Sequence, residues 1–123
     1  MLRFVILRHE MPPGRDRGMH FDLMLETGGV LRTWSLPELP AAGKVVQAKA
    51  LPDHRLAYLD YEGPVSANRG TVSRVEEGEY EVLAESSGLW RIHLVGRVLR
   101  GNLELRQEEI SAGAWTIRLW DDA

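Results

Sequence analysis

The chain has 123 residues and no cysteine, which excludes disulfides, thiolate metal sites and cysteine nucleophiles. Its formal net charge is −3, so binding to nucleic acid would require a local basic patch rather than the overall charge. No apolar run has the length of a signal-peptide core or of a membrane span, which predicts a cytoplasmic protein. We expect a single domain over residues 1–123.

Short alternations of apolar and polar residues, separated by glycine-containing turns, predict β-strands along almost the whole chain. In chain order, the predicted strands are residues 4–8, 20–26, 30–36, 44–51, 56–61, 70–75, 80–84, 90–95, 97–99, 103–106 and 114–120. No segment keeps a helical period, so we expect only short helical turns. The pattern predicts an all-β fold, a small closed β-barrel of about eight short, mostly antiparallel strands. Packing in its core or at its rim is expected for at least three of the four tryptophans.

Two glycine-containing turns predict hairpins within this series. Thr27-Gly28-Gly29 is a good connection between the second and third predicted strands. A second turn is expected at residues 77–79, Glu-Gly-Glu. Because five acidic residues lie between positions 76 and 85, we expect this second hairpin to be solvated and to form an edge of the sheet.

The stretch GMHFDLMLE, residues 18–26, carries polar side chains on one face of a predicted strand. Successive strand side chains point to opposite faces, so Leu23 and Leu25 share a face that is typical of a core. The opposite face carries His20 and Asp22. An imidazole and a carboxylate held at this fixed separation offer one nitrogen and one oxygen ligand to a divalent cation.

His9 ends the first predicted strand, which we expect to pair beside the strand of His20 and Asp22. Two imidazoles and a carboxylate suit manganese, iron or zinc and leave coordination positions open. One chemistry for such a centre is a two-His-one-carboxylate iron oxygenase, which needs a distant histidine such as His54 or His93. The other is metal-assisted phosphoester hydrolysis. A His–Asp pair that only forms a hydrogen bond also fits the spacing, which leaves all three readings open.

Three longer stretches are more specific: HFDLMLETGGVLRTWSLP at 20–37, LPDHRLAYLDYEGPVS at 51–66 and LVGRVLRGNLELR at 94–106. In this order they resemble the 3′-phosphoesterase domain of bacterial DNA ligase D. The resemblance implies a β-barrel whose interior holds a manganese site, with Zn²⁺ or Co²⁺ as other metals. It also implies an activity in DNA repair that removes a 3′-phosphate or a 3′-ribonucleotide and leaves a 3′-hydroxyl.

The amino-acid sequence of these stretches is similar to that of a free-standing branch of the family, in which the domain is not attached to a ligase or polymerase module. The implied substrate is the 3′ end of a nucleic acid, such as a primer–template. The implied protein partner is a separately encoded ligase or polymerase, and no membrane is involved.

Residue by residue, the resemblance implies three metal ligands, His9, His20 and Asp22. His54 matches the histidine that contacts the scissile phosphate, and Tyr58 matches the tyrosine four residues after it. Together these five residues are the expected catalytic and metal-binding set.

Other residues are expected to assist. Arg15 and Arg17 lie in the connection between the first two histidines and could contact the substrate, as could Arg55. Glu26 shares the strand face of the ligands, and Asp53 directly precedes the catalytic histidine. We expect both acidic residues to support the site.

The sequence departs from the family pattern at four supporting positions. Met24 and Val46 stand where the family has arginine, Glu38 stands where it has lysine, and Pro52 stands where it has glutamate. Loss of a charge-assisted contact to phosphate costs about 1.5–3 kcal/mol. These departures motivate an alternative function, a barrel that binds nucleic-acid ends or a repair partner without turnover.

Overall fold

The computed structural model describes residues 1–14, 18–108 and 113–121. Its elements are, in chain order, β1 (Leu2–Glu10), β2 (His20–Thr27), β3 (Val30–Leu36), β4 (Val45–His54), the 3-10 helix η1 (Leu56–Leu59), β5 (Gly63–Pro64), β6 (Thr71–Ser86), β7 (Leu89–Gly96), β8 (Arg100–Gln107) and β9 (Ala114–Asp121).

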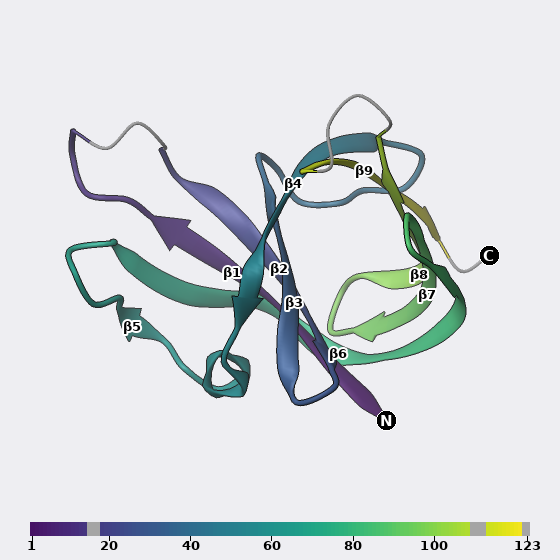
Figure 1. The fold of residues 1–123 in the computed structure, drawn as a ribbon, viewed down its shortest axis with the longest axis horizontal. Helices are drawn as coiled ribbons and strands as arrows, with labels where there is room; N and C mark the ends of the chain where they lie inside the picture. The colour runs from purple at the N-terminus through teal and green to yellow at the C-terminus, as the bar shows by residue number, and fades with distance from the viewer. Residues whose placement is uncertain (15–17, 109–112, 122–123) are drawn as a thin grey trace.

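Eight of the strands form one antiparallel sheet that closes into a ring (Figure 1). The order around the ring is β1-β2-β3-β4-β9-β8-β7-β6, and β6 pairs with β1 to complete it. The two-residue strand β5 pairs with the beginning of β6, on the edge opposite to β1. Closure leaves few open strand edges. The expected all-β, barrel-like fold with about eight antiparallel strands is confirmed.

Apolar side chains from all eight strands fill the interior of the ring. Trp34 packs edge-on against Trp90 and Trp115, with ring centroids 6.2 and 5.5 Å apart. These three tryptophans are buried, as expected, whereas Trp120 is exposed. Each buried large apolar side chain contributes about 1.5–3 kcal/mol, so this interior is the main source of stability.

A smaller apolar cluster covers the outer face of β1 and β2. Val5, Leu7 and Met24 pack there beneath Leu59 of η1, and Tyr58 packs against the same cluster. Figure 1 shows η1 below the end of β4, which runs in front of β2 and β3. The segment that follows β4 therefore roofs one outer patch of the barrel wall.

Residues 56–61 do not form the predicted strand. Leu56–Leu59 make a single 3-10 turn instead, in which the amide of Tyr58 donates to the carbonyl of Arg55 at 3.1 Å. The turn is favoured because it brings the apolar Leu59 onto the outer cluster. Within the described residues, no helix is long and apolar enough to cross a membrane.

The predicted turn at 77–79 is also wrong, because β6 runs unbroken through it. Gly78 lies in mid-strand, where an added Cβ would come within 2.0 Å of the carbonyl oxygen of Val95. The glycine allows β6 and β7 to approach closely rather than turning the chain. The expectation of a solvated edge holds only for the end of this strand: residues 71–80 pair with β1, whereas residues 81–86 are exposed and pair with β7 alone.

The turn between β7 and β8 is organised by Glu76, whose side chain is 3 % exposed. Its Oε1 accepts the amides of Glu77 at 2.9 Å and Arg97 at 2.7 Å. Its Oε2 accepts the amides of Val98 at 2.9 Å and Leu99 at 2.8 Å. The sequence predicts a strand over the last three of these residues, but a buried carboxylate holds them as a turn.

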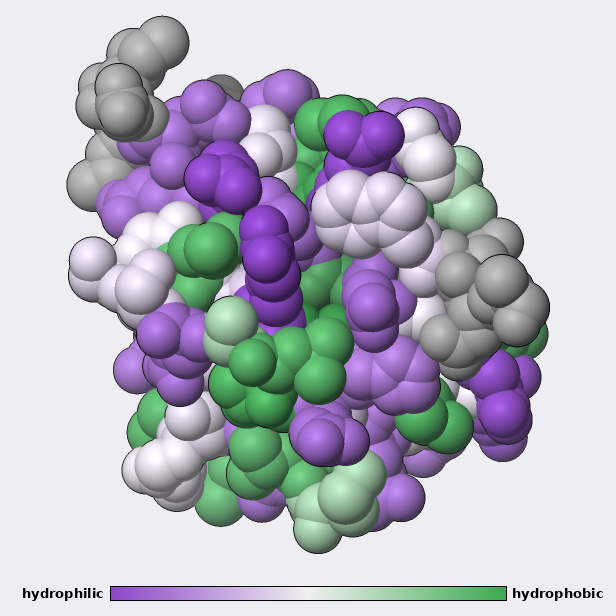
Figure 2. Space-filling model, turned by 90° about the vertical axis from the view of Figure 1, so that its right-hand side faces the viewer, coloured by the Kyte–Doolittle hydropathy of each residue, from purple (hydrophilic) through white to green (hydrophobic). Residues whose placement is uncertain are grey.

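Figure 2 faces the side of the molecule that carries β7, β8 and β9, where hydrophobic side chains gather in a band between hydrophilic ones. Exposed hydrophobic residues on these strands and on the adjoining part of β6 include Leu83, Val95 and Trp120. The described residues that were selected from the sequence lie elsewhere, on β1, β2, the end of β4 and the η1 segment that follows it.

Candidate metal centre

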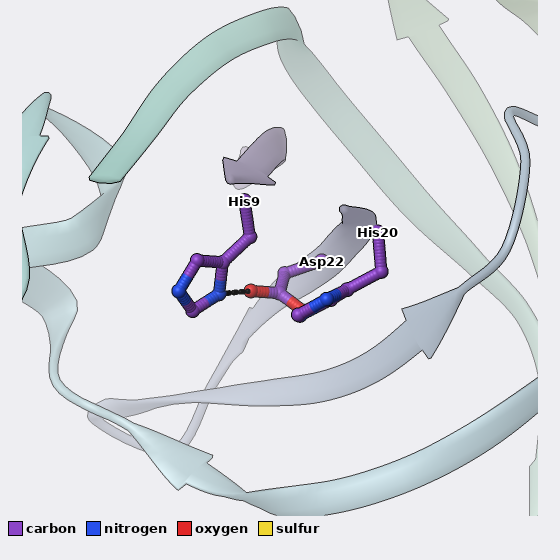
Figure 3. Close-up of side chains that lie close together, drawn as sticks. All are labelled: His9, His20 and Asp22. Carbon is purple, nitrogen blue, oxygen red and sulfur yellow. Dashed lines mark hydrogen bonds and ion pairs between the residues drawn. The ribbon is translucent and has the colours of Figure 1, made fainter. Parts of the chain in front are cut away.

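The pairing of β1 with β2 brings His9, His20 and Asp22 together. His9 lies opposite His20 in the antiparallel register, and Leu7 lies opposite Asp22. Because opposed residues and residues two apart share a face, all three polar side chains project from one side of the sheet. One ligand atom from each lies within 4.8 Å of the others. Figure 3 shows the three side chains pointing toward one another.

This centre lies on the outer face of the barrel wall and not inside it. Asp22 shares its face with Met24, which packs in the outer cluster, whereas Leu23 and Leu25 face the apolar interior. The expectation of a metal site within the barrel is therefore wrong. The interior is filled with apolar side chains, which would not compensate the desolvation of a cation.

Backbone carbonyls orient both imidazoles. Nε2 of His9 lies 2.6 Å from the carbonyl oxygen of Arg69, and Nδ1 of His20 lies 3.1 Å from that of Gly18. A carbonyl only accepts, so these ring nitrogens carry the hydrogen. The other nitrogens face Asp22: Nδ1 of His9 forms a hydrogen bond with Oδ2 at 3.1 Å, and Nε2 of His20 lies 3.3 Å from Oδ1. Without their hydrogen, these two nitrogens carry the lone pairs that can bind a metal ion. A carbonyl behind each imidazole is the usual arrangement for a metal-ligating histidine.

The carboxylate of Asp22 is anionic and incompletely satisfied. Burial raises its pKa, but the interactions with His20 and His9 outweigh burial and lower the pKa to about 2. Its Oδ1 is buried and makes no hydrogen bond within the described residues. A divalent cation would satisfy this oxygen and the two imidazole lone pairs at once, so the residues present fit a metal ion.

A cavity of about 350 Å³ opens over this centre. His9 and Asp22 line one side of it. His54 and Tyr58, from the end of β4 and from η1, line another. The structure thus brings two of the expected metal ligands and the expected catalytic pair to one cavity, and the third ligand, His20, lies beside Asp22 in Figure 3.

His54 is held in place by its own neighbours. Its Nδ1 donates to the carbonyl oxygen of Pro52 at 2.9 Å, and its ring stands edge-on to Tyr58 with centroids 5.6 Å apart. Nε2 is then the nitrogen that can face a ligand in the cavity. Pro52 lacks the carboxylate that the family pattern has at this position, but its main chain still orients the histidine.

Arg55 and Asp53 also line the cavity, whereas Glu26 does not. The Arg55 guanidinium forms no ion pair or hydrogen bond within the described residues, and Asp53 lies 4.0 Å from Arg32. Glu26 accepts the amide of Arg3 at 2.9 Å, near the other end of β2. Its place indicates a role in holding β1, and support of the site stays a prediction.

The two arginines expected to contact the substrate, Arg15 and Arg17, lie outside the described residues.

Sequence reasoning missed Arg69, which lines the cavity and whose carbonyl orients His9. It follows two residues with positive φ, Ala67 at 61° and Asn68 at 54°. Gly70 comes next, with φ of 89°, and an added Cβ there would come within 1.9 Å of the carbonyl oxygen of Glu10. The Asn-Arg-Gly sequence is a turn signal, but no sequence pattern indicates the direction of a carbonyl.

The departures from the family pattern have distinct places in the structure. Met24 is buried in the outer cluster at the edge of the cavity. Val46 is buried in the barrel interior and cannot contact a substrate. Glu38 forms an ion pair with Lys44 and does not line the cavity over the metal centre.

Comparisons with known proteins identify the family of the chain. The family model of the DNA Ligase D 3′-phosphoesterase domain matches residues 13–121, a range that begins after His9. The multifunctional non-homologous end joining protein LigD of Pseudomonas aeruginosa is 27% identical over 92 residues. That alignment covers 73% of this chain but only 10% of the relative. The chain therefore spans about a tenth of the length of the curated relative that it matches. The match over most of its length shows that the chain belongs to the DNA ligase D 3′-phosphoesterase domain family.

Proposed function

We propose that the protein is a divalent-metal-dependent phosphoesterase that acts on the 3′ ends of nucleic acids. It removes a 3′-phosphate or a 3′-ribonucleotide and leaves a 3′-hydroxyl for repair. Membership of the 3′-phosphoesterase family supports the reaction class. The observation that carries the proposal is the convergence of His9, His20 and Asp22, of which His9 and Asp22 line the same cavity as His54. The name of the Pseudomonas aeruginosa relative supports a place in end joining.

His9, His20 and Asp22 would hold the cation, and manganese suits this set of two nitrogens and one oxygen, as do zinc and cobalt. A bound divalent cation supplies charge neutralisation on a phosphate oxygen and lowers the pKa of a bound water. The carbonyls of Arg69 and Gly18 keep the ligating nitrogens turned toward Asp22.

His54 supplies the second positive partner of the phosphate. With Nδ1 donating to Pro52, Nε2 of the protonated ring can donate to a phosphate oxygen or protonate the leaving 3′-oxygen. Hydrolysis of a 3′-phosphate moves the phosphoryl group to water and returns the 3′-oxygen with a proton. Arg55, at the cavity wall, offers a planar fork for two phosphate oxygens.

The test is a hydrolysis assay on a primer–template that ends in a 3′-phosphate or in one ribonucleotide. We expect conversion to a 3′-hydroxyl with Mn²⁺ and none after chelation. His54→Ala should retain the metal and lose at least about a hundredfold in rate. His93→Ala, a histidine of β7 that does not line the cavity, is the matched control and should match the wild type.

Binding of ends without turnover is the second candidate, and the residues at positions 24 and 46 favour it. Met24 and Val46 stand where the family pattern has arginine, and the side chain of Val46 faces the interior. Measurable binding of the 3′-phosphate end without any conversion, in protein loaded with Mn²⁺, would establish this candidate in place of the first. Family membership favours both over an iron oxygenase.

A further inference from the structure

A second cavity of about 230 Å³ adjoins the one over the metal centre. The two cavities share three lining residues, Arg55, Tyr58 and Val65. Beyond this shared wall, Tyr61 and Pro64 line only the second cavity. A ligand whose phosphate lies at the metal centre could therefore place the chemical group attached to that phosphate in the adjoining second cavity.

Three aromatic rings lead from the first cavity to the second. Tyr58 stands edge-on to His54 at 5.6 Å and edge-on to Tyr61 at 5.8 Å between ring centroids. Tyr61 is 39% exposed, so part of its ring remains available to a ligand. Its hydroxyl donates to the carbonyl oxygen of Pro64, which holds the ring in one orientation. A ring held in this way loses little conformational freedom when a ligand stacks on it.

The positive charge of Arg55, where the two cavities adjoin, limits the class of ligand that fits them. Arg55 lines both cavities, and its guanidinium makes no ion pair within the described part of the chain. An apolar ligand would bury this cation without a partner, which is unfavourable. A nucleotide offers both chemistries, because its phosphate can pair with the guanidinium while its base has an apolar face for Tyr61, Pro64 and Val65.

We propose that the second cavity is a nucleobase subsite. The base of the 3′-terminal nucleotide occupies this cavity and stacks on Tyr61. Arg55, which lines both cavities, contacts the phosphate of the same nucleotide. This inference rests on the proposed function for the site that it extends. It assigns to the protein a preference for 3′ ends that carry an intact base over ends that lack one.

Binding without turnover tests the inference directly. Two fluorescent oligonucleotides with a 3′-phosphate are compared by anisotropy in the presence of a chelator, one with a normal last nucleotide and one with an abasic last residue. The wild type should bind the base-bearing end about five- to a hundredfold more tightly, the range for stacking of one base on an aromatic side chain. Tyr61→Leu should bring the two affinities within about twofold of each other.

Trp120→Leu is the matched control, because Trp120 is an aromatic residue of similar exposure, 42%, that does not line either cavity. It should keep the full preference for the base-bearing end. Equal affinities of the wild type for the two ends would overturn the subsite, and this comparison needs no variant to fold. Retention of the preference in Tyr61→Leu, or its loss in Trp120→Leu, would also overturn it.

Hydrolysis is measured separately, so the two proposals fail separately. If the protein loaded with Mn²⁺ leaves the 3′-phosphate intact but prefers the base-bearing end, the proposed function is wrong and the subsite stands. If it removes the phosphate and binds both ends equally, the proposed function stands and the subsite is overturned.

Discussion

Asp22 and Glu76 are both buried carboxylates with a lowered pKa, and they have opposite roles. Burial raises the pKa of Glu76, but four backbone amides that donate to it more than reverse that effect. Burial likewise raises the pKa of Asp22, but there the opposing groups are two imidazoles. The partners of the two carboxylates therefore differ in kind: fixed donors in one case, potential metal ligands in the other.

The difference in partners separates a structural carboxylate from a functional one. Backbone amides cannot turn away, and they satisfy both oxygens of Glu76, so this side chain fixes the β7–β8 turn. Asp22 has a buried oxygen without a hydrogen bond within the described residues, and the imidazoles beside it become metal ligands when they give up the hydrogen that faces it. Burial and pKa alone would not distinguish the two sites.

Removal of Glu76 should have the largest effect on stability. Glu76→Ala leaves the buried amides of the turn without an acceptor, and we expect a loss of about 3 kcal/mol or more in the free energy of unfolding. Urea denaturation measures it, with Glu79→Ala, an exposed acid of the same strand, as control. A loss below about 1 kcal/mol, no larger than for an ordinary exposed site, would contradict the structural role.

Removal of the Asp22 charge should have its main effect on metal binding. Asp22→Asn should weaken Mn²⁺ affinity by at least about a hundredfold, because one of three ligands loses its charge. Without metal the variant should be somewhat less stable than the wild type at neutral pH, because the lowered pKa of Asp22 shows that the folded chain favours its charged form. Thermal melts with and without Mn²⁺ report both, since a metal at a hundred times its Kd stabilises by about 2.7 kcal/mol. An equal rise of the melting temperature with Mn²⁺ in variant and wild type would contradict the role of Asp22 as a metal ligand.

The turn that carries Arg69 should tune metal affinity more mildly. In Gly70→Ala the new Cβ would meet the Glu10 carbonyl oxygen, 1.9 Å away, and shift the Arg69 carbonyl from His9. We expect Mn²⁺ affinity to fall about tenfold, as for other groups that orient a metal ligand. Calorimetric titration measures it. Gly113→Ala, where a Cβ meets nothing within 4 Å, is the control and should bind as the wild type does.

The smallest expected effect is in the pH dependence of stability. The pKa of Glu76 is lower in the folded chain than its ordinary value, so its stabilisation is present above the unfolded value of about 4.3 and is lost as the pH falls toward the folded value. The free energy of unfolding of the wild type should therefore fall with pH more steeply below about pH 4 than that of Glu76→Gln. Parallel curves for the two proteins would contradict the assignment.

The convergence of the three ligands could be predicted from the sequence because it depends on local rules. His20 and Asp22 are two apart on a strand, so they share a face, and His9 ends the neighbouring strand. The side of the barrel could not be predicted, because both faces of β2 carry apolar residues. Met24 is as buried as Leu23, but the roof that buries it comes from η1, which the sequence presents as a strand.

Other features lay beyond the sequence because they are properties of the backbone. Gly78 reads as a turn residue, and only the approach of Val95 in β7 explains it. Glu76 reads as one of five solvated acids, although the amides that bury its charge come from about 20 residues further along the chain. The role of the Arg69 carbonyl cannot be predicted from the sequence, because every residue has a backbone carbonyl whatever its side chain.

A crystal structure with Mn²⁺, phased at the manganese edge, tests the central claim most directly. We predict one anomalous peak on the outer face of the barrel, within about 2.0–2.3 Å of His9 Nδ1, His20 Nε2 and an oxygen of Asp22. A peak inside the barrel, or no peak between these three residues at saturating Mn²⁺, would contradict the account.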